Sequence, residues 1–143
     1  MFVDLNELID VVIYYKKVGR QYAAYNQKDF DALDLKDDKE KEKYSKVNLK
    51  MKQLTWGLYN ELQENSITKG LNGDRTWNYK LYKENRLKNL VVSWDAKKKN
   101  EKGELVPVPL NPESILSLSP DIAEAILSTY DSITLLDDAA EKK

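Results

Sequence analysis

Residues 46–54, Lys-Val-Asn-Leu-Lys-Met-Lys-Gln-Leu, alternate between polar and apolar side chains as far as Met51. Val47, Leu49 and Met51 fall on one side of an extended chain, while the lysines and Asn48 fall on the other. A period of two is typical of a strand that buries one face in a core and exposes the other face to water. The stretch therefore predicts an antiparallel sheet with one solvated face.

The preceding segment, residues 10–26, favours two further strands. Its apolar run Val11-Val12-Ile13-Tyr14-Tyr15 is β-branched and aromatic, and Gly19 can turn the chain back along residues 21–25 as a hairpin. A helix over residues 5–25 is the open alternative, because apolar side chains also recur there at helical spacing, at Leu5, Leu8, Ile9, Val12 and Tyr15. The strands are the preferred interpretation.

Residues 27–44 are dominated by charge and offer only Phe30, Ala32, Leu33 and Leu35 for burial. They predict a charged loop or insertion, or a loosely attached helical turn. The acidic residues from Asp29 onward do not match a calcium-binding loop of the EF-hand type, because Asp34 occupies the sixth position, where that loop requires glycine. No metal site is expected.

Downstream of the strand the sequence predicts mostly helices. Thr55 is a candidate N-cap for a helix that starts at Trp56, and the glycines and asparagine within residues 65–74 indicate a loop. A long helix is expected over residues 76–94, because Leu87, Leu90, Val91 and Trp94 follow helical spacing.

The last third begins with a charged loop over residues 95–108, which continues as an extended segment through Pro107 and Pro109. Asn111-Pro112-Glu113 and Ser119-Pro120-Asp121 each read as a helix start. The second helix carries apolar residues on one side, namely Ile122, Ala123, Ile126, Leu127, Tyr130 and Ile133, and residues 137–143 are expected to fray.

These elements predict one α+β domain over residues 1–143. In it, a small antiparallel sheet from the N-terminal half packs against three to four helices from the C-terminal half.

Charge argues against a general nucleic-acid binder, because 23 basic and 24 acidic side chains nearly cancel. Residues 46–102 carry 13 Lys/Arg against 6 Asp/Glu, whereas residues 103–143 carry 2 against 8. Either the basic middle and the acidic end face each other within the fold, or they form a two-faced docking surface. The basic run Lys97-Lys98-Lys99 could contact phosphate, but an exposed hairpin or loop tip explains it better.

The sequence offers few residues that could serve in catalysis. The chain contains no cysteine and no histidine, so it lacks thiolates and the commonest general base and metal ligand. Its longest apolar run is far shorter than the roughly 20 residues of a membrane span. We expect a non-enzymatic, cytoplasmic protein without cofactors that acts on neither nucleic acid nor membrane.

Residues 47–133 resemble a family of tailed-phage proteins known as tail assembly chaperones. The resemblance rests on an ordered series of motifs: Met51-Lys52-Gln53-Leu54-Thr55-Trp56-Gly57, Arg86 to Asp95 with its Val-x-x-Trp ending, a loop containing Gly103, Val106-Pro107-Val108, Asn111-Pro112-Glu113-Ser114-Ile115, and Leu118-Ser119-Pro120-Asp121-Ile122-Ala123. The first 46 residues fall outside it.

The resemblance implies a protein that binds phage tail proteins in the host cytoplasm, the long tape-measure protein first and the tail tube subunits second. Aromatic side chains are favoured in protein interfaces, so the candidate partner-binding residues are Trp56, Tyr59, Trp77, Tyr79 and Tyr82. Burial in the core is the alternative for several of them, for Trp56 above all. Other functions compatible with the sequence are a structural tail or baseplate subunit of the virion and a general protein-interaction adaptor, and a homo-oligomer is compatible with each.

Overall fold

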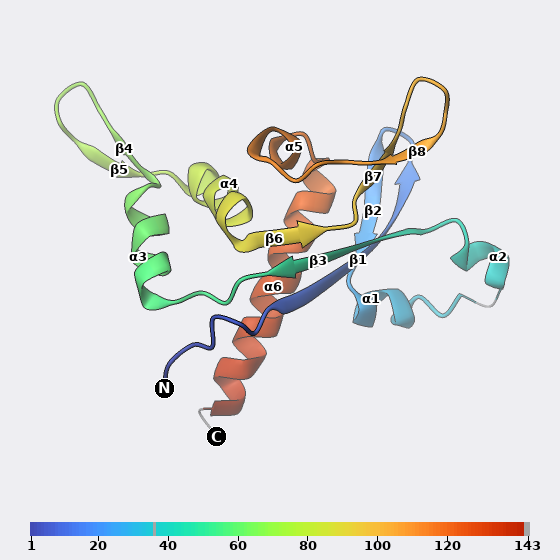
Figure 1. The fold of residues 1–143 in the computed structure, drawn as a ribbon, viewed down its shortest axis with the longest axis horizontal. Helices are drawn as coiled ribbons and strands as arrows, with labels where there is room; N and C mark the ends of the chain where they lie inside the picture. The colour runs from blue at the N-terminus through green and yellow to red at the C-terminus, as the bar shows by residue number, and fades with distance from the viewer. Residues whose placement is uncertain (36, 142–143) are drawn as a thin grey trace.

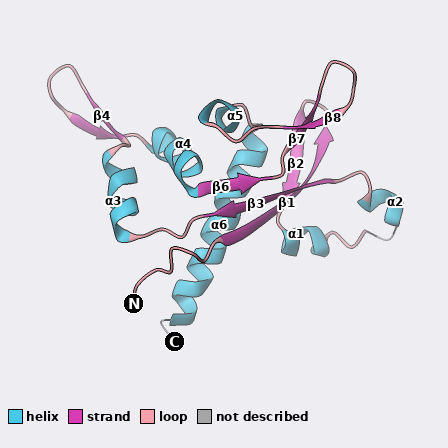
Figure 2. Cartoon of the chain, in the orientation of Figure 1, coloured by secondary structure: helices cyan, strands magenta, loops and turns pink. Residues whose placement is uncertain are grey.

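The structure, a computed structural model, describes the backbone of residues 1–35 and 37–141 and the side chains of residues 1–35 and 37–134. It confirms the α+β class: a four-stranded antiparallel sheet is covered on one face by helices (Figures 1 and 2). The strand order is β2-β1-β3-β6.

The N-terminal hairpin follows the preferred sequence interpretation. Strands β1 (Ile9–Val18) and β2 (Gln21–Tyr25) pair antiparallel, and Gly19 takes a φ of 65° in the turn between them. Only glycine enters this left-handed region without strain, so the tight turn depends on it. The helical alternative for residues 5–25 is therefore wrong.

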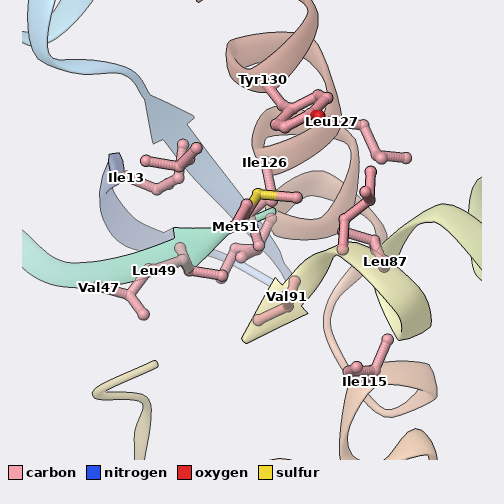
Figure 3. Close-up of a cluster of buried hydrophobic side chains, with 13 residues drawn as sticks. Ile13, Val47, Leu49, Met51, Leu87, Val91, Ile115, Ile126, Leu127 and Tyr130 are labelled. Atoms are coloured by element: carbon pink, nitrogen blue, oxygen red, sulfur yellow. The ribbon is translucent and has the colours of Figure 1, made fainter. Parts of the chain in front are cut away.

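Strand β3 (Ser45–Met51) has the predicted alternation, with Val47, Leu49 and Met51 buried and the residues between them exposed. The register pairs Leu49 with Val11 and Val47 with Ile13, so the apolar side chains of both strands share one face. Helix α6 (Pro120–Glu141) lies across that face (Figure 1). Figure 3 shows Ile126 of α6 next to Met51, with Tyr130 one turn further along the helix.

The predicted helix over residues 76–94 is wrong at both ends. Helix α4 spans Tyr79–Leu90 only; before it lies strand β5 (Arg75–Trp77), and after it lies strand β6 (Val91–Trp94). Strand β6 pairs with β3, Leu49 opposite Trp94 and Met51 opposite Val91. Val91 is thus buried as a strand residue, because pairing with an existing strand outweighs the helical spacing of its side chain.

Two predicted loops contain short hairpins. Strand β4 (Ile67–Lys69) lies within the expected loop at 65–74 and pairs with β5, which directly follows that loop. Strands β7 (Lys97–Lys99) and β8 (Leu105–Pro107) pair with each other, and both lie within the expected loop at 95–108. Pro107 ends an outer strand, where its missing N–H does no harm. The hairpins project at opposite ends of the molecule (Figure 1).

The charged insertion contains two short helices, α1 (Gln27–Ala32) and α2 (Asp38–Lys41). Phe30 of α1 stacks on Tyr14 with the ring centroids 4.0 Å apart, and Tyr44 meets Phe30 edge-on. Tyr14 lies on the sheet face that α6 does not cover, opposite Tyr25. The rings of Tyr14, Phe30 and Tyr44 therefore attach the insertion to the sheet face that α6 leaves uncovered.

The remaining helices begin where the sequence predicts. Thr55 caps α3 (Trp56–Glu64) by accepting a hydrogen bond from the Leu58 amide, and Asn111 caps α5 (Pro112–Leu116) in the same way. Helix α6 continues to Glu141, so the backbone of residues 137–141 is helical, whereas residues 142 and 143 of the expected frayed tail lie outside the described residues.

Candidate functional site

The five candidate aromatic residues come from three neighbouring elements, α3, β5 and α4, at one end of the molecule (Figure 1). Helix α3 presents two of them. Its Leu62 is buried and Leu58 packs against the core, while Trp56 and Tyr59, one turn apart, remain 81% and 42% exposed. The alternative that Trp56 belongs to the core is therefore wrong.

Strand β5 and helix α4 contribute the other three. The ring of Trp77 lies 5.0 Å from that of Tyr82, measured between centroids. Tyr79 is 61% exposed one turn before Tyr82, and the Lys83 ammonium lies over its ring. Asn78 sets the start of α4 by accepting a hydrogen bond from the Leu81 amide, which fixes Tyr79 and Tyr82 on the first turn.

A stack of planar groups joins this cluster to the core. The Arg86 guanidinium lies 5.5 Å from the centroid of Tyr82 and 5.8 Å from that of Tyr130, and it pairs with Asp131 of α6. Tyr130 in turn donates its hydroxyl hydrogen to the carbonyl of Lys52. Tyr82 is consequently connected to the core through Arg86 and Tyr130.

Burial is the main influence on the pKa of Tyr82. Burial raises the pKa of Tyr82; the Arg86 charge opposes this, and Tyr59 and Tyr79 raise the pKa a little further. The structure brings Trp77 against Tyr82, places Tyr79 one turn before Tyr82 on α4, and places Trp56 and Tyr59 on the neighbouring helix α3. We call these five residues the aromatic cluster.

Ion pairs join part of the basic middle of the chain to its acidic end. Lys83 pairs with Glu124 at 2.5 Å and Arg86 pairs with Asp131, so two basic residues of α4 meet two acidic residues of α6. The hydrogen bond from Lys83 to Glu124 raises the pKa of Lys83. These contacts support the interpretation in which the basic middle and the acidic end face each other within the fold.

Sequence reasoning missed a second surface feature, a groove of roughly 580 Å³ between the base of the β7–β8 hairpin and helices α5 and α6. Its lining includes Tyr15, Tyr22, Trp94 and Lys97. The helical spacing of Trp94 predicts a helix there, and no local pattern indicates that β2, the β7–β8 hairpin and α5 meet. We call this feature the β7–α5 groove.

The other candidate sites offer little chemistry. Within residues 1–35 and 37–134, acidic side chains form no group able to hold a metal ion. Lys97, Lys98 and Lys99 stand in a hairpin, as the better interpretation of that run predicted. No helix in the described part of the chain is both long and apolar enough to cross a bilayer.

Comparison of the chain with protein-family models, with curated proteins and with solved structures finds no match.

Proposed function

We propose that this protein is a non-enzymatic assembly chaperone for a phage tail, and that its aromatic cluster holds an amphipathic helix of a tail protein such as the tape-measure protein. The observation that carries the proposal is that three tyrosines and two tryptophans lie on the neighbouring elements α3, β5 and α4 at one end of the molecule, four of the five more than 40% exposed. Exposed apolar residues that gather on one surface, unlike scattered ones, mark interaction sites.

The chemistry of the cluster suits a helical partner. Tyrosine and tryptophan supply large contact areas at a low cost in side-chain entropy, and they dominate the binding energy of many interfaces. A long helical protein exposes an apolar stripe until its assembly partners cover it, and such a stripe aggregates. A small domain with a rigid aromatic surface can cover the stripe reversibly, as in other cases where a helix docks on an apolar surface.

The support beneath the cluster favours binding over a packing role. Tyr82 is fixed by Arg86 and Trp77, so the surface is formed before the partner arrives and loses little entropy on binding. Trp56 and Tyr79 are largely exposed to solvent, where they contribute little to folding. The resemblance of residues 47–133 to tail assembly chaperones supplies the identity of the partner.

Co-expression tests the proposal. The tagged chain is produced together with the product of each neighbouring gene, starting with the longest helical tail protein, and stable pairs are identified by size-exclusion chromatography. We expect a complex with the tape-measure protein and better solubility of that protein. Failure to co-purify with any tail protein would contradict the proposal.

Mass spectrometry of purified virions separates a chaperone from a structural subunit. A chaperone leaves before the particle is complete, so its peptides should be absent from virions and present in the infected-cell lysate. Stoichiometric recovery of the chain from purified particles would instead identify a tail or baseplate subunit.

A further inference from the structure

The β7–α5 groove has an apolar floor built from residues distant in sequence. Tyr15 of β1, Tyr22 of β2 and Trp94 of β6 line it from the sheet, and Leu118 and Ile122 line it from the helical side. The indole nitrogen of Trp94 donates to the carbonyl of Val108 at 2.8 Å, so its polar atom is already satisfied. Trp94 therefore offers the groove an apolar ring with no unmet hydrogen bond.

The walls carry polar groups of mainly one character. Lys97 and Lys98 stand on the hairpin side, and Ser114 and Ser119 stand on the helical side, with Glu113 the single acidic lining residue. Neither lysine forms an ion pair with any residue whose side chain the structure describes. Ammonium and hydroxyl groups both donate hydrogen bonds, so the rim can bind an anionic acceptor. The floor below it offers an apolar surface.

Local hydrogen bonds hold the walls in place. The Val108 amide donates to the Ala96 carbonyl at 2.9 Å and closes the base of the β7–β8 hairpin. On the other side, Asn111 caps α5, and Asp121 at the start of α6 accepts a hydrogen bond from the Tyr22 amide. The groove is thus bordered by elements tied to the sheet, and it exists before any ligand binds.

We propose that the β7–α5 groove is a second docking site, which takes a segment of a partner protein that carries a large apolar side chain beside a carboxylate. The apolar side chain fits over Trp94 and Leu118, and the carboxylate meets Lys97 and Lys98. Charge complementarity argues for an acidic segment. A nucleic acid fits less well, since the apolar floor would face its phosphates. This site shares no residue with the aromatic cluster and stands independently of the proposed function.

Peptide titration followed by NMR of the ¹⁵N-labelled full chain tests this proposal. The probe is an acetylated, amidated peptide with a leucine pair between aspartates, and the matched control replaces each aspartate by asparagine. We expect the aspartate peptide to shift the indole N–H signal of Trp94 and to bind at least about tenfold more tightly than the control. Equal binding of the two peptides, or no shift at Trp94, would overturn the proposal.

Two charge-reversal variants locate the contact. Lys97→Glu with Lys98→Glu changes the rim and should weaken peptide binding about tenfold or more, whereas Lys99→Glu with Lys102→Glu makes the same change in charge on the same hairpin outside the groove and should have less effect. All four lysines are exposed, so both variants should fold. Equal losses in the two variants would show a diffuse charge effect and contradict docking in the groove.

Two other occupants give distinct results. A single-stranded oligonucleotide that displaces the aspartate peptide from Trp94 would identify a nucleic-acid site. Trp94 shifts that grow with protein concentration alone, together with a doubled mass in light scattering, would identify a second copy of this chain. Either outcome overturns the assignment of a partner peptide.

Discussion

Arg86 joins the aromatic cluster to the core. Its side chain is nearly buried although charged, and it is stabilised by the rings of Tyr82 and Tyr130 and by the carboxylate of Asp131. A charge at such a position is tolerated only when it is paired.

Replacing Arg86 by alanine should therefore destabilise the fold by about 2–4 kcal/mol, because it leaves a cavity and removes the partner of Asp131. Urea denaturation measures the change. Lys80→Ala, on the exposed side of the same helix, is the control and should change the free energy of unfolding by less than about 0.5 kcal/mol. An Arg86→Ala variant as stable as the wild type would contradict the stack.

Asp95, which precedes the β7–β8 hairpin, is hydrogen-bonded to Asn48 of β3. Its two carboxylate oxygens accept hydrogen bonds from the backbone and the side-chain amide of Asn48, at 2.7 and 2.8 Å. Burial alone would raise the pKa of Asp95, but these hydrogen bonds outweigh it and lower the pKa below its usual value of 3.8. The folded state thus prefers the ionised carboxylate.

The lowered pKa of Asp95 makes the stability of the fold depend on pH. A group whose pKa is lower in the folded state stabilises the fold above its unfolded pKa, and this contribution is lost as the pH falls through the folded value. We expect Asp95→Ala to cost about 1 kcal/mol at pH 7 and less at pH 2, because the wild-type carboxylate gains a proton as the pH falls through its lowered pKa. Urea denaturation of both proteins at the two pH values measures the difference. An equal cost at both would contradict the role of the carboxylate.

Among helices and strands, the insertion at residues 27–44 is held on the sheet by aromatic contacts in which Phe30 is the central ring. Phe30 stacks on Tyr14 and meets Tyr44, and no residue of α1 or α2 is fully buried. Phe30→Ala should release the insertion while costing the core only about 1–2 kcal/mol.

Limited trypsin digestion with mass spectrometry tests this expectation. Cleavage at Lys28, Lys39 and Lys41 should accelerate several-fold in Phe30→Ala, because the segment no longer rests on the sheet. Cleavage in the β7–β8 hairpin is the internal control and should keep its rate. Unchanged cleavage within 27–44 would show that other contacts hold the insertion.

Elements with a clear local pattern could be predicted from the sequence. Alternation identified β3, and capping residues identified the starts of α3, α5 and α6. Strand β6 could not be identified, because Leu87, Leu90, Val91 and Trp94 have helical spacing, and only pairing with β3 makes the last two extended. Short strands that form by pairing with distant residues leave little local signal.

In the complete fold, one candidate site could be predicted from its residue types and the other forms only through tertiary contacts. The aromatic cluster could be anticipated because its residue types are those of interfaces, although the sequence alone could not establish that Trp56 is exposed. The β7–α5 groove could not be anticipated, since it arises where β2, the β7–β8 hairpin and α5 meet. Its residues acquire a common surface only in the tertiary fold.

Binding by a variant with an altered aromatic cluster tests whether this cluster is the partner-binding surface. Trp56→Ala with Tyr79→Ala removes the two most exposed rings of the cluster and should leave the free energy of unfolding nearly unchanged. Leu105→Ala with Leu116→Ala, which removes exposed apolar side chains elsewhere, is the matched control. Calorimetry with a helical segment of the tape-measure protein should show at least about a tenfold loss of affinity for the first variant and none for the control. Equal affinities for the wild type and both variants, or no binding by the wild type, would contradict the account.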